Sequence, residues 1–380
     1  MPTGIRIRAY NVLFGDCVLL SLPDEGKTKH LLFDFGNVTG KGGANKVFEP
    51  IARNLKKVTG GTLDLLVMTH EHLDHMEGFL AQRAVFDTMA VRRVWMSIPS
   101  KPDYYDKHPK SKQAFALTQR ILEFTKKTFA ERGLSANLQW NALLLNNLSN
   151  VDRINYVRKL AGAKRTHYLY RGLSTKGKHD FKDVRFRILA PEEEMSVYYG
   201  SALALAGGMA DFRRTLGRAP ERRVVPEHIS ATDFERLRQG LQTGDLAAVH
   251  EIDKAKNNTS LVVLVEAQSK KLLFTGDAEV ESWHKMHKLG LLGRVDFLKV
   301  SHHGSWNGTP AVNGKNVLDI LFPLKNEQTG IALVSTKSNV YGTVNKVPDE
   351  KTLTLLKKHC KEVYSTEKQA AGKLYVDIEL

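Results

Sequence analysis

The segment 65–79, "LLVMTHEHLDHMEGF", carries four metal-capable side chains directly after an apolar run. His70, His72, Asp74 and His75 fall within six consecutive positions. Neutral imidazole and carboxylate groups are the usual protein ligands of zinc and related divalent ions. On a loop that leaves a strand, His70 and His72 point the same way and can bind one ion, while Asp74 and His75 face a second ion beside it. Bound divalent ions activate water, so the pattern predicts a hydrolytic metal site.

A polar loop with solvated histidines is the alternative interpretation of this segment. By composition alone, a His-x-His-x-Asp-His pattern anywhere in the chain is about a one-in-a-thousand event, which favours the metal site. Glu71 lies between two candidate ligands and would point away from an ion that they face. The site needs rigid support, and a buried strand expected over "LDLLVMT" ends just before it.

Hydrophobic periodicity predicts the elements that must position these residues. The first 37 residues read as strands and turns, ending in "HLLFDFG", and a helix over "GANKVFEPIARNLKKV" follows. Helical patterns at about 102–173 and 191–250 interrupt the β-rich remainder. After them we expect "TSLVVLVEA" and "KKLLFTGD" to form a hairpin about Gln268 to Lys270. Further strands are predicted in "VDFLKVSHHG", "GIALVST", "EVYST" and "KLYVDIEL". The predicted fold class is α/β, as one domain over 1–380 with two basic helical insertions.

Composition describes a globular protein with a substantial core. Of the 380 residues, 42% are hydrophobic and 26% are charged, which argues against a disordered chain. No apolar run approaches the ~20 residues of a membrane helix, and the first residues do not resemble a signal peptide. Cys17 and Cys360 provide neither a disulfide framework nor a zinc-ribbon spacing. These features predict a cytoplasmic protein with no membrane partner.

The formal net charge of +15 favours a polyanionic partner such as nucleic acid. Between residues 151 and 187, Lys and Arg greatly outnumber Asp, and three tyrosines are interleaved with them. Cations for phosphates and aromatic rings for bases are the ingredients of single-strand or end binding. A solvated helix face with tyrosines in the core is the competing interpretation. The candidate substrate-binding residues are Arg153, Arg158, Lys159, Lys164, Arg165 and Asn258.

The segment "THEHLDHMEG" resembles the signature of the metallo-β-lactamase fold, whose members are αββα sandwiches with a metal site at the strand ends. Other motifs of that family occur in the expected order. "LLFDFG" resembles the first motif, which implies that Asp34 orients a ligand histidine. "LLFTGD" resembles the fourth and implies that Asp277 is a bridging carboxylate. "LKVSHHGS" resembles the fifth and implies that His302 binds the second ion.

A narrower resemblance is to the ComEC-type competence hydrolases, and it covers most of the chain outside the insertions. It rests on "YNVLFGDCVLL", "NNTSLVVLVE", "HHGS" and the final "ALVSTKSNVYG…YSTEKQAAGKLYVDI". The opening motif keeps Asp16, a second candidate for orienting the ligands, but has Leu13 and Phe14 where relatives have Gly-Gln. The third-motif histidine is absent, and Thr343 stands where a later histidine is expected. One bound ion instead of two therefore remains open.

The resemblance implies a metal-dependent nuclease or phosphodiesterase that uses one or two Zn²⁺ or Mn²⁺ ions. Asp74 would be a ligand and would also orient the metal-activated hydroxide. His303, the spare histidine of "SHHGS", would contact a phosphate oxygen or protonate the leaving oxygen. A merely packed His303 is the alternative. With the basic residues described above, the resemblance implies hydrolysis of phosphodiesters in DNA or RNA.

Two other functions fit the same residues. The first is hydrolysis of a small phosphodiester, such as a cyclic nucleotide or a lipid head group. The second is a binding or effector subunit whose helical insertions dock a protein partner. An open basic groove would favour the polymer, and a closed lid would favour the small molecule. The oligomeric state is not indicated by the sequence.

Overall fold

The computed structural model gives the positions of most of the chain. The described residues are 4–38, 44–131, 143–144, 146–147, 150–200, 249–324, 328–338, 340 and 347–380. They fall into two compact units. The larger unit consists of Met1–Tyr104, Asn150–Glu193 and Lys256–Leu380, and the smaller unit consists of Tyr105–Ser149 and Glu194–Ala255.

A seven-stranded sheet forms the first layer of the larger unit's core, in the order β17-β1-β2-β3-β5-β7-β8. The antiparallel part joins β17, β1, β2 and β3, and the parallel part continues from β3 through β5 and β7 to β8. The strands are β1 (Arg6–Tyr10), β2 (Val18–Asp24), β3 (Lys27–Phe33), β5 (Leu65–Met68), β7 (Val94–Ser97), β8 (Thr166–Leu169) and β17 (Tyr375–Glu379).

A six-stranded sheet in the order β16-β15-β12-β11-β10-β9 forms the second layer. β10 and β11 form the hairpin expected about Gln268 to Lys270, which is confirmed. From β11 onward, the strands β11, β12, β15 and β16 are parallel. The strands are β9 (Arg185–Ala190), β10 (Val262–Ala267), β11 (Lys270–Phe274), β12 (Phe297–Lys299), β15 (Ile331–Val334) and β16 (Glu362–Ser365).

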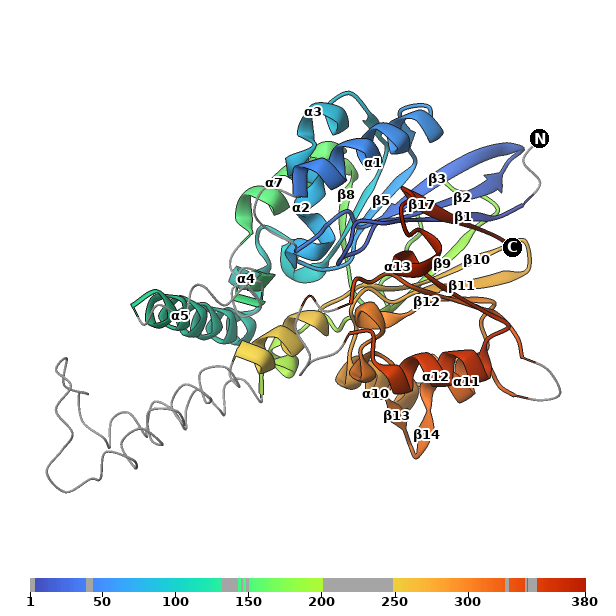
Figure 1. Ribbon diagram of the computed structural model, residues 1–380. Helices are drawn as coiled ribbons and strands as arrows, with labels where there is room; N and C mark the ends of the chain where they lie inside the picture. The colour runs from blue at the N-terminus through green and yellow to red at the C-terminus, as the bar shows by residue number, and fades with distance from the viewer. Residues whose placement is uncertain are drawn as a thin grey trace, which may run out of the picture. The chain divides into compact units, whose positions relative to one another are not determined.

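The two sheets pack face to face around an apolar core. Phe33 of β3 stacks on Phe274 of β11 with ring centroids 4.0 Å apart and an interplanar angle of 5°. Because side chains alternate along a strand, Leu31 and Phe33 enter this core while Leu32 faces the opposite side of its sheet. A four-layer arrangement follows, with helices on the outer face of each sheet (Figure 1).

The helices complete the two outer layers. Those on the seven-stranded sheet are α1 (Ala44–Val58), α2 (Leu73–Ala81), α3 (Arg83–Phe86) and α7 (Val151–Leu160). Those on the six-stranded sheet are α10 (Val280–Lys288), α11 (Val317–Leu321) and α12 (Glu350–His359). Remaining elements of the larger unit are β4 (Thr62–Leu63), β6 (Ala90–Val91), β13 (Ala311–Val312), β14 (Lys315–Asn316), α13 (Thr366–Gln369), and the 3₁₀ turns η1 (Ile98–Ser100), η3 (Ala163–Arg165), η5 (Ser301–Gly304) and η6 (Trp306–Gly308). The predicted α/β class is confirmed.

The smaller unit is helical where it is described. α4 (Tyr104–Lys107) begins at the boundary of the units, and α5 (Pro109–Glu131) and η4 (Met195–Tyr198) belong to the smaller one. The backbone N–H of Ser196 donates to the Ser111 hydroxyl at 3.0 Å. Residues 150–173, which we expected inside the first insertion, instead lie in the larger unit and contribute α7 and β8 to it. Positions 201–248 of the second expected insertion lie outside the described residues.

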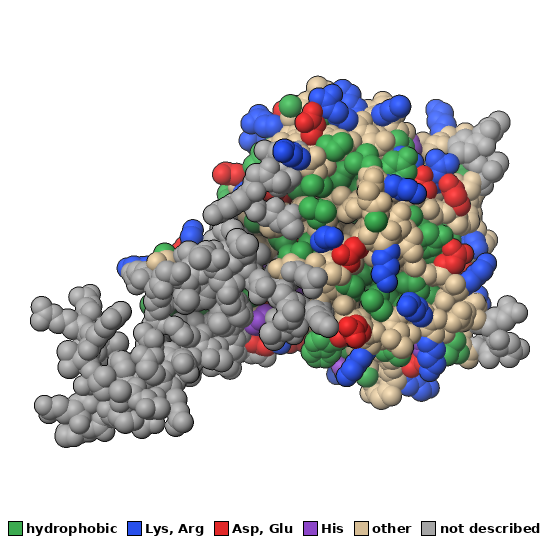
Figure 2. All heavy atoms as spheres, viewed as in Figure 1, with side chains coloured by type: hydrophobic (Ala, Val, Ile, Leu, Met, Phe, Trp, Pro, Cys, Tyr) green, Lys and Arg blue, Asp and Glu red, His purple; other side chains and the backbone are tan. Residues whose placement is uncertain are grey.

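Within the described part of the chain, no helix combines the length and apolar character needed to cross a membrane. Lys and Arg side chains are scattered over the visible face, with acidic and apolar side chains between them (Figure 2).

Candidate metal centre

Loops from the ends of four strands in the two sheets meet at one place. In the seven-stranded sheet, Asp34 follows β3, and the His70–His75 segment follows β5, which is parallel to β3. In the six-stranded sheet, Asp277 follows β11, and His303 follows β12, which is parallel to β11. Because the carboxyl ends of parallel strands lie at the same edge of a sheet, each sheet brings two loops together.

Asp74, His75, Asp277 and His303 form a buried cluster, referred to below as the metal cluster. One potential ligand atom from each residue lies within 4.8 Å of all the others. His303 Nε2 lies 3.2 Å from both Asp74 Oδ2 and Asp277 Oδ2. His75 Nε2 lies 3.2 Å from Asp277 Oδ2 and 3.9 Å from Asp74 Oδ1. Two imidazoles and two carboxylates are a donor set that suits zinc or manganese.

His70 and His72 are buried beside the metal cluster but are not members of it. The His70 ring centroid lies 4.2 Å from that of His75, and His70 Nε2 lies 3.0 Å from His72 Nδ1. Burial lowers the pKa of His72 to about 3, and the nearby Lys256 ammonium adds to this effect. Burial and the adjacent His75 also hold the pKa of His70 well below its usual value. Both rings are therefore in the neutral form that binds metal.

Asp34 lies where the first motif implied, beside a histidine of the metal cluster. Its Oδ2 lies 2.8 Å from His75 Nδ1 and accepts a hydrogen bond of 2.7 Å from the Thr69 hydroxyl. Its Oδ1 accepts a 2.7 Å hydrogen bond from the Thr69 backbone N–H. Asp34 thereby fixes the His75 ring so that Nε2 faces Asp277, an arrangement in which a carboxylate orients a metal-binding histidine.

Asp16 contacts a buried lysine that the sequence analysis missed. Lys299 Nζ forms an ion pair with Asp16, donates to the Gly276 carbonyl at 3.1 Å, and lies 3.5 Å from Asp277 Oδ1. Burial alone would lower the pKa of Lys299, but Asp16 and Asp277 outweigh it and raise that pKa. The sequence held one signal for Lys299. This lysine ends β12, a buried strand of three residues whose other two members are apolar.

The two adjacent histidines of "SHHGS" have different surroundings. His303 is packed against Phe14, with Nδ1 2.8 Å from the Ser335 carbonyl and Nε2 facing the metal cluster. His302, which we expected as the ligand of a second ion, lies outside the metal cluster and has its Nδ1 3.0 Å from Glu279 Oε1. Both residues have positive φ angles, 47° and 52°, so the chain turns sharply after β12 and directs the two rings differently. Glu279 stands at the N-cap of α10.

Close backbone packing holds Asp74 in place. A Cβ atom at Gly36 would lie 2.3 Å from the Asp74 carbonyl carbon, and one at Gly15 would lie 2.6 Å from the Asp74 carbonyl oxygen. The Asp16 backbone N–H donates to the same Asp74 carbonyl at 2.9 Å. Any larger residue at either glycine would displace the loop, which explains why both motifs contain glycine there.

The charges and unsatisfied atoms of the cluster fit a bound cation. The carboxylates of Asp16, Asp34, Asp74 and Asp277 are buried, and Lys299 is the ammonium in ionic contact with two of them. With neutral histidines, four negative charges and one positive charge leave three uncompensated. Among the described residues, His75 Nε2 and Asp277 Oδ1 have no hydrogen-bond partner. Uncompensated buried charge is strongly unfavourable, so these residues could hold a metal ion.

Without a metal, protons supply part of that positive charge. Burial alone would lower the pKa of His75, but Asp277, Asp34 and Asp74 raise it well above the usual value. Burial alone would also lower the pKa of His303. The surrounding carboxylates, of which Asp277 has the largest effect, outweigh burial and raise the pKa of His303 to about 9. A metal ion would therefore displace protons from these two imidazoles.

The predicted substrate-binding residues are not gathered at the metal cluster. Arg153 pairs with Glu77 of α2, and Arg158 donates to the Ser100 carbonyl. Lys159, Lys164 and Arg165 are exposed on α7 and η3. Asn258 is buried, and its Oδ1 accepts hydrogen bonds of 3.1 Å from the backbone N–H groups of Glu279 and Ser282, at the first turn of α10.

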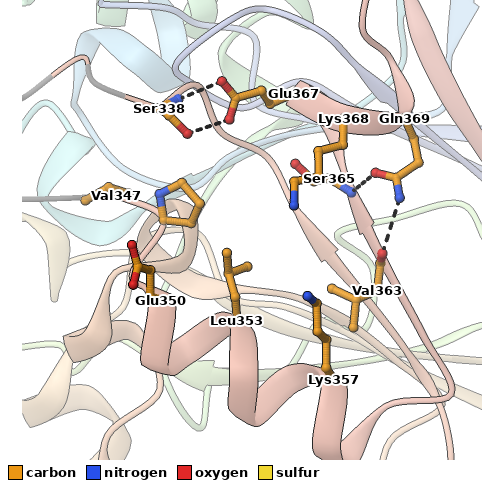
Figure 3. Close-up of a pocket in the computed structure, with 11 residues that line it drawn as sticks. Ser338, Val347, Glu350, Leu353, Lys357, Val363, Ser365, Glu367, Lys368 and Gln369 are labelled. Carbon is orange, nitrogen blue, oxygen red and sulfur yellow. Dashed lines mark hydrogen bonds between the residues drawn. The ribbon is translucent and has the colours of Figure 1, made fainter.

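A cavity of about 380 Å³ lies elsewhere in the larger unit, between α12, β16 and α13 (Figure 3). Glu350 and Lys357 of α12 line it together with Glu367 of α13. The Glu367 carboxylate accepts hydrogen bonds from the Ser338 hydroxyl and backbone N–H at 2.6 and 3.2 Å. The cavity shares no residue with the metal cluster, and its mixed charges favour neither an anion nor a cation.

Comparison with known proteins gives partial matches. No family model matches the chain. Over 154 residues, or 40% of this chain, it is 30% identical to ComE operon protein 3 of Bacillus subtilis. Over 71 residues, or 19% of this chain, it is 37% identical to Recombination protein 2 of Haemophilus influenzae. These segments cover 18% and 9% of the two relatives, so the chain spans less than a fifth of either.

Proposed function

We propose that this chain is a metal-dependent phosphodiester hydrolase that cleaves DNA or RNA. The observation that carries the proposal is the convergence of Asp74, His75, Asp277 and His303, which come from segments that follow strands of both sheets. Such buried clusters of imidazoles and carboxylates, with strongly perturbed pKa values, are typical of functional sites. In this proposal the cluster binds one or two metal ions, which are Zn²⁺ or Mn²⁺.

The layered architecture supports a metallo-β-lactamase fold. Its αββα sandwich carries the metal site at the strand ends, and the metal cluster lies at the ends of β5, β11 and β12. The partial similarity to ComE operon protein 3 favours the ComEC-type subgroup within that fold. The name of the second relative refers to recombination, a process that acts on DNA.

Each residue of the centre has a defined part in this proposal. A divalent ion, when bound, would activate water and offset the charge on the phosphoryl oxygens. Asp74, Asp277, His75 and His303 would hold it, with His70 and His72 as neighbouring neutral imidazoles. Asp34 orients His75 through Nδ1. Lys299 contacts Asp277 Oδ1, and Oδ2 of the same carboxylate faces His75 and His303.

Charge supports a polymeric substrate over a small one. The net charge of +15 exceeds what a small phosphodiester needs, and a nucleic acid backbone presents many phosphates to such a surface. The exposed Lys159, Lys164 and Arg165 would contact that backbone. Because their contribution is electrostatic, binding should weaken steeply as salt is raised.

The decisive experiment incubates the full chain with single- and double-stranded DNA and RNA, linear and circular, with and without Mn²⁺ or Zn²⁺. We expect metal-dependent cleavage that is abolished by Asp277→Asn. Asp106→Asn is the matched control, because Asp106 is exposed and its ion pair lies in the smaller unit. Turnover of a cyclic nucleotide without cleavage of any polymer would favour the small-substrate function. Biological activity that survives Asp277→Asn would favour a binding subunit.

A further inference from the structure

Trp306 is an exposed aromatic side chain next to the loop that carries His303. Its exposure is 64%, the highest among the large apolar side chains of the described residues. By contrast, Trp95 and Trp283 are completely buried in the cores of the larger unit. Exposing an indole leaves a large apolar surface in water, so its position on this turn needs a reason.

The turn that carries Trp306 is held by the two residues that follow it. Asn307 is buried, and its Nδ2 donates to Glu279 Oε2 at 2.6 Å. A Cβ atom at Gly308 would lie 2.5 Å from the Ser301 carbonyl oxygen, which shows how closely η6 packs on η5. The indole therefore projects from a closely packed support.

The same contacts link the indole to the metal cluster. Trp306 follows His303 by three positions, so their Cα atoms are at most about 11 Å apart. Asn307 Oδ1 also lies 3.3 Å from Nδ1 of His302, the residue before His303. The indole and His303 of the metal cluster are therefore carried by one continuous loop after β12.

We propose that Trp306 is a stacking platform for a nucleobase of the strand that is cleaved. This inference rests on the proposed function and narrows its substrate to single-stranded nucleic acid or an unpaired end. Every base has a π-face that can stack on an indole, whereas bases inside a duplex are already stacked on each other. A rigid, amphipathic aromatic ring beside a phosphate-directed site suits this ligand, because stacking buries the ring without requiring base-specific hydrogen bonds.

Binding of a fluorescent single-stranded oligonucleotide to the full chain, without added metal, tests the proposal. Trp306→Ala should weaken binding between about fivefold and one hundredfold, and Trp306→Phe should retain most of it. Leu289→Ala is the matched control, because Leu289 is another exposed apolar side chain, on a different turn, and should bind as the wild type does. Thermal melting of all variants checks that each one folds.

An oligonucleotide of the same length with abasic positions separates stacking from charge. The wild type and Trp306→Ala should bind it equally, because it keeps its phosphates and lacks bases. Equal binding of the normal oligonucleotide by both proteins would overturn the proposal and leave the indole for a protein partner. An equal loss on both oligonucleotides would also overturn it. If the wild type neither binds nor cleaves nucleic acid, both the stacking role and the proposed function fail. Normal cleavage by Trp306→Ala at low substrate concentration would contradict the stacking role and leave the proposed function intact.

Discussion

The imidazole of His303 lies 3.2 Å from the carboxylate of Asp74, although 229 positions separate them in the chain. Asp74 belongs to α2 on the seven-stranded sheet, and His303 follows β12 of the six-stranded sheet. Neither sheet completes the metal cluster alone, so the cluster forms only when the two sheets pack face to face.

Replacing the two adjacent histidines separately should distinguish their roles. His303→Ala removes a member of the metal cluster, and we expect metal affinity to fall more than about a hundredfold, with loss of hydrolysis. His302→Ala should have a smaller effect, because its ring contacts Glu279 instead. Calorimetric titration of Mn²⁺ or Zn²⁺ measures both. The reverse order of effects would contradict the position of these rings.

Asp34→Asn tests the orientation of His75. The amide keeps the size of the side chain but accepts fewer hydrogen bonds and lacks the charge that stabilises a metal-binding imidazole. We expect metal affinity to fall by about 10- to 100-fold, with an unchanged fold by circular dichroism. Asp319→Asn on α11 is the control and should bind metal normally. Unchanged affinity in Asp34→Asn would show that His75 is oriented by other contacts.

Metal binding should strengthen as the pH rises. His75 and His303 have raised pKa values without metal, the latter about 9, so both are protonated at neutral pH. A metal ion must displace these protons. For each proton displaced, the apparent metal affinity should rise about tenfold per pH unit while the pH is below the pKa of that histidine. Titrations at pH 6.5 and 8.5 and proton release in two buffers measure this effect. Equal affinity at both pH values would contradict it.

The sequence was informative about loops and less so about individual side chains. The resemblance of four motifs to the metallo-β-lactamase family implied that the residues after β3, β5, β11 and β12 would meet. It did not predict that His303 rather than His302 faces Asp277, since that depends on two successive positive φ angles. Nor did it predict Lys299, whose charge is balanced by residues distant in sequence. Thr343, where relatives have a histidine, lies outside the described residues.

Lys299→Met should destabilise the metal-free protein more than the metal-bound one. The substitution leaves Asp16 and Asp277 without their buried cation, and breaking a buried pair this way costs about 3–5 kcal/mol. A bound divalent ion supplies replacement charge and adds stability by mass action. Thermal melting with and without Mn²⁺ measures the difference, and Lys299→Arg keeps the charge as a control. Equal destabilisation in both conditions would show that the metal does not share this charge balance.

Asp24 should contribute stability that is lost in acid. Burial alone would raise the pKa of Asp24, but its hydrogen bonds from Lys29, Lys182 and Asp183 lower it. Because the folded pKa is below the unfolded value of about 3.9, the contribution is present above that pH and disappears as the pH falls through the folded pKa. We expect Asp24→Asn to lower the free energy of unfolding by about 1–3 kcal/mol at pH 7 and by less near pH 3. Urea titrations at both pH values measure this, and an equal loss at both would contradict it.

The pairing of β1 with β17 has a kinetic consequence. Arg8 on β1 binds Asp377 on β17 with two hydrogen bonds of 2.7 Å across 369 positions. The sheet that supports His70–His75 therefore gains one of its strands only after residues 11–374 have been synthesised. Contacts between such distant segments slow folding, because the intervening chain must lose entropy before they form. During translation, the exposed edge of β1 would remain available to chaperones or to other unpaired strands until β17 emerges.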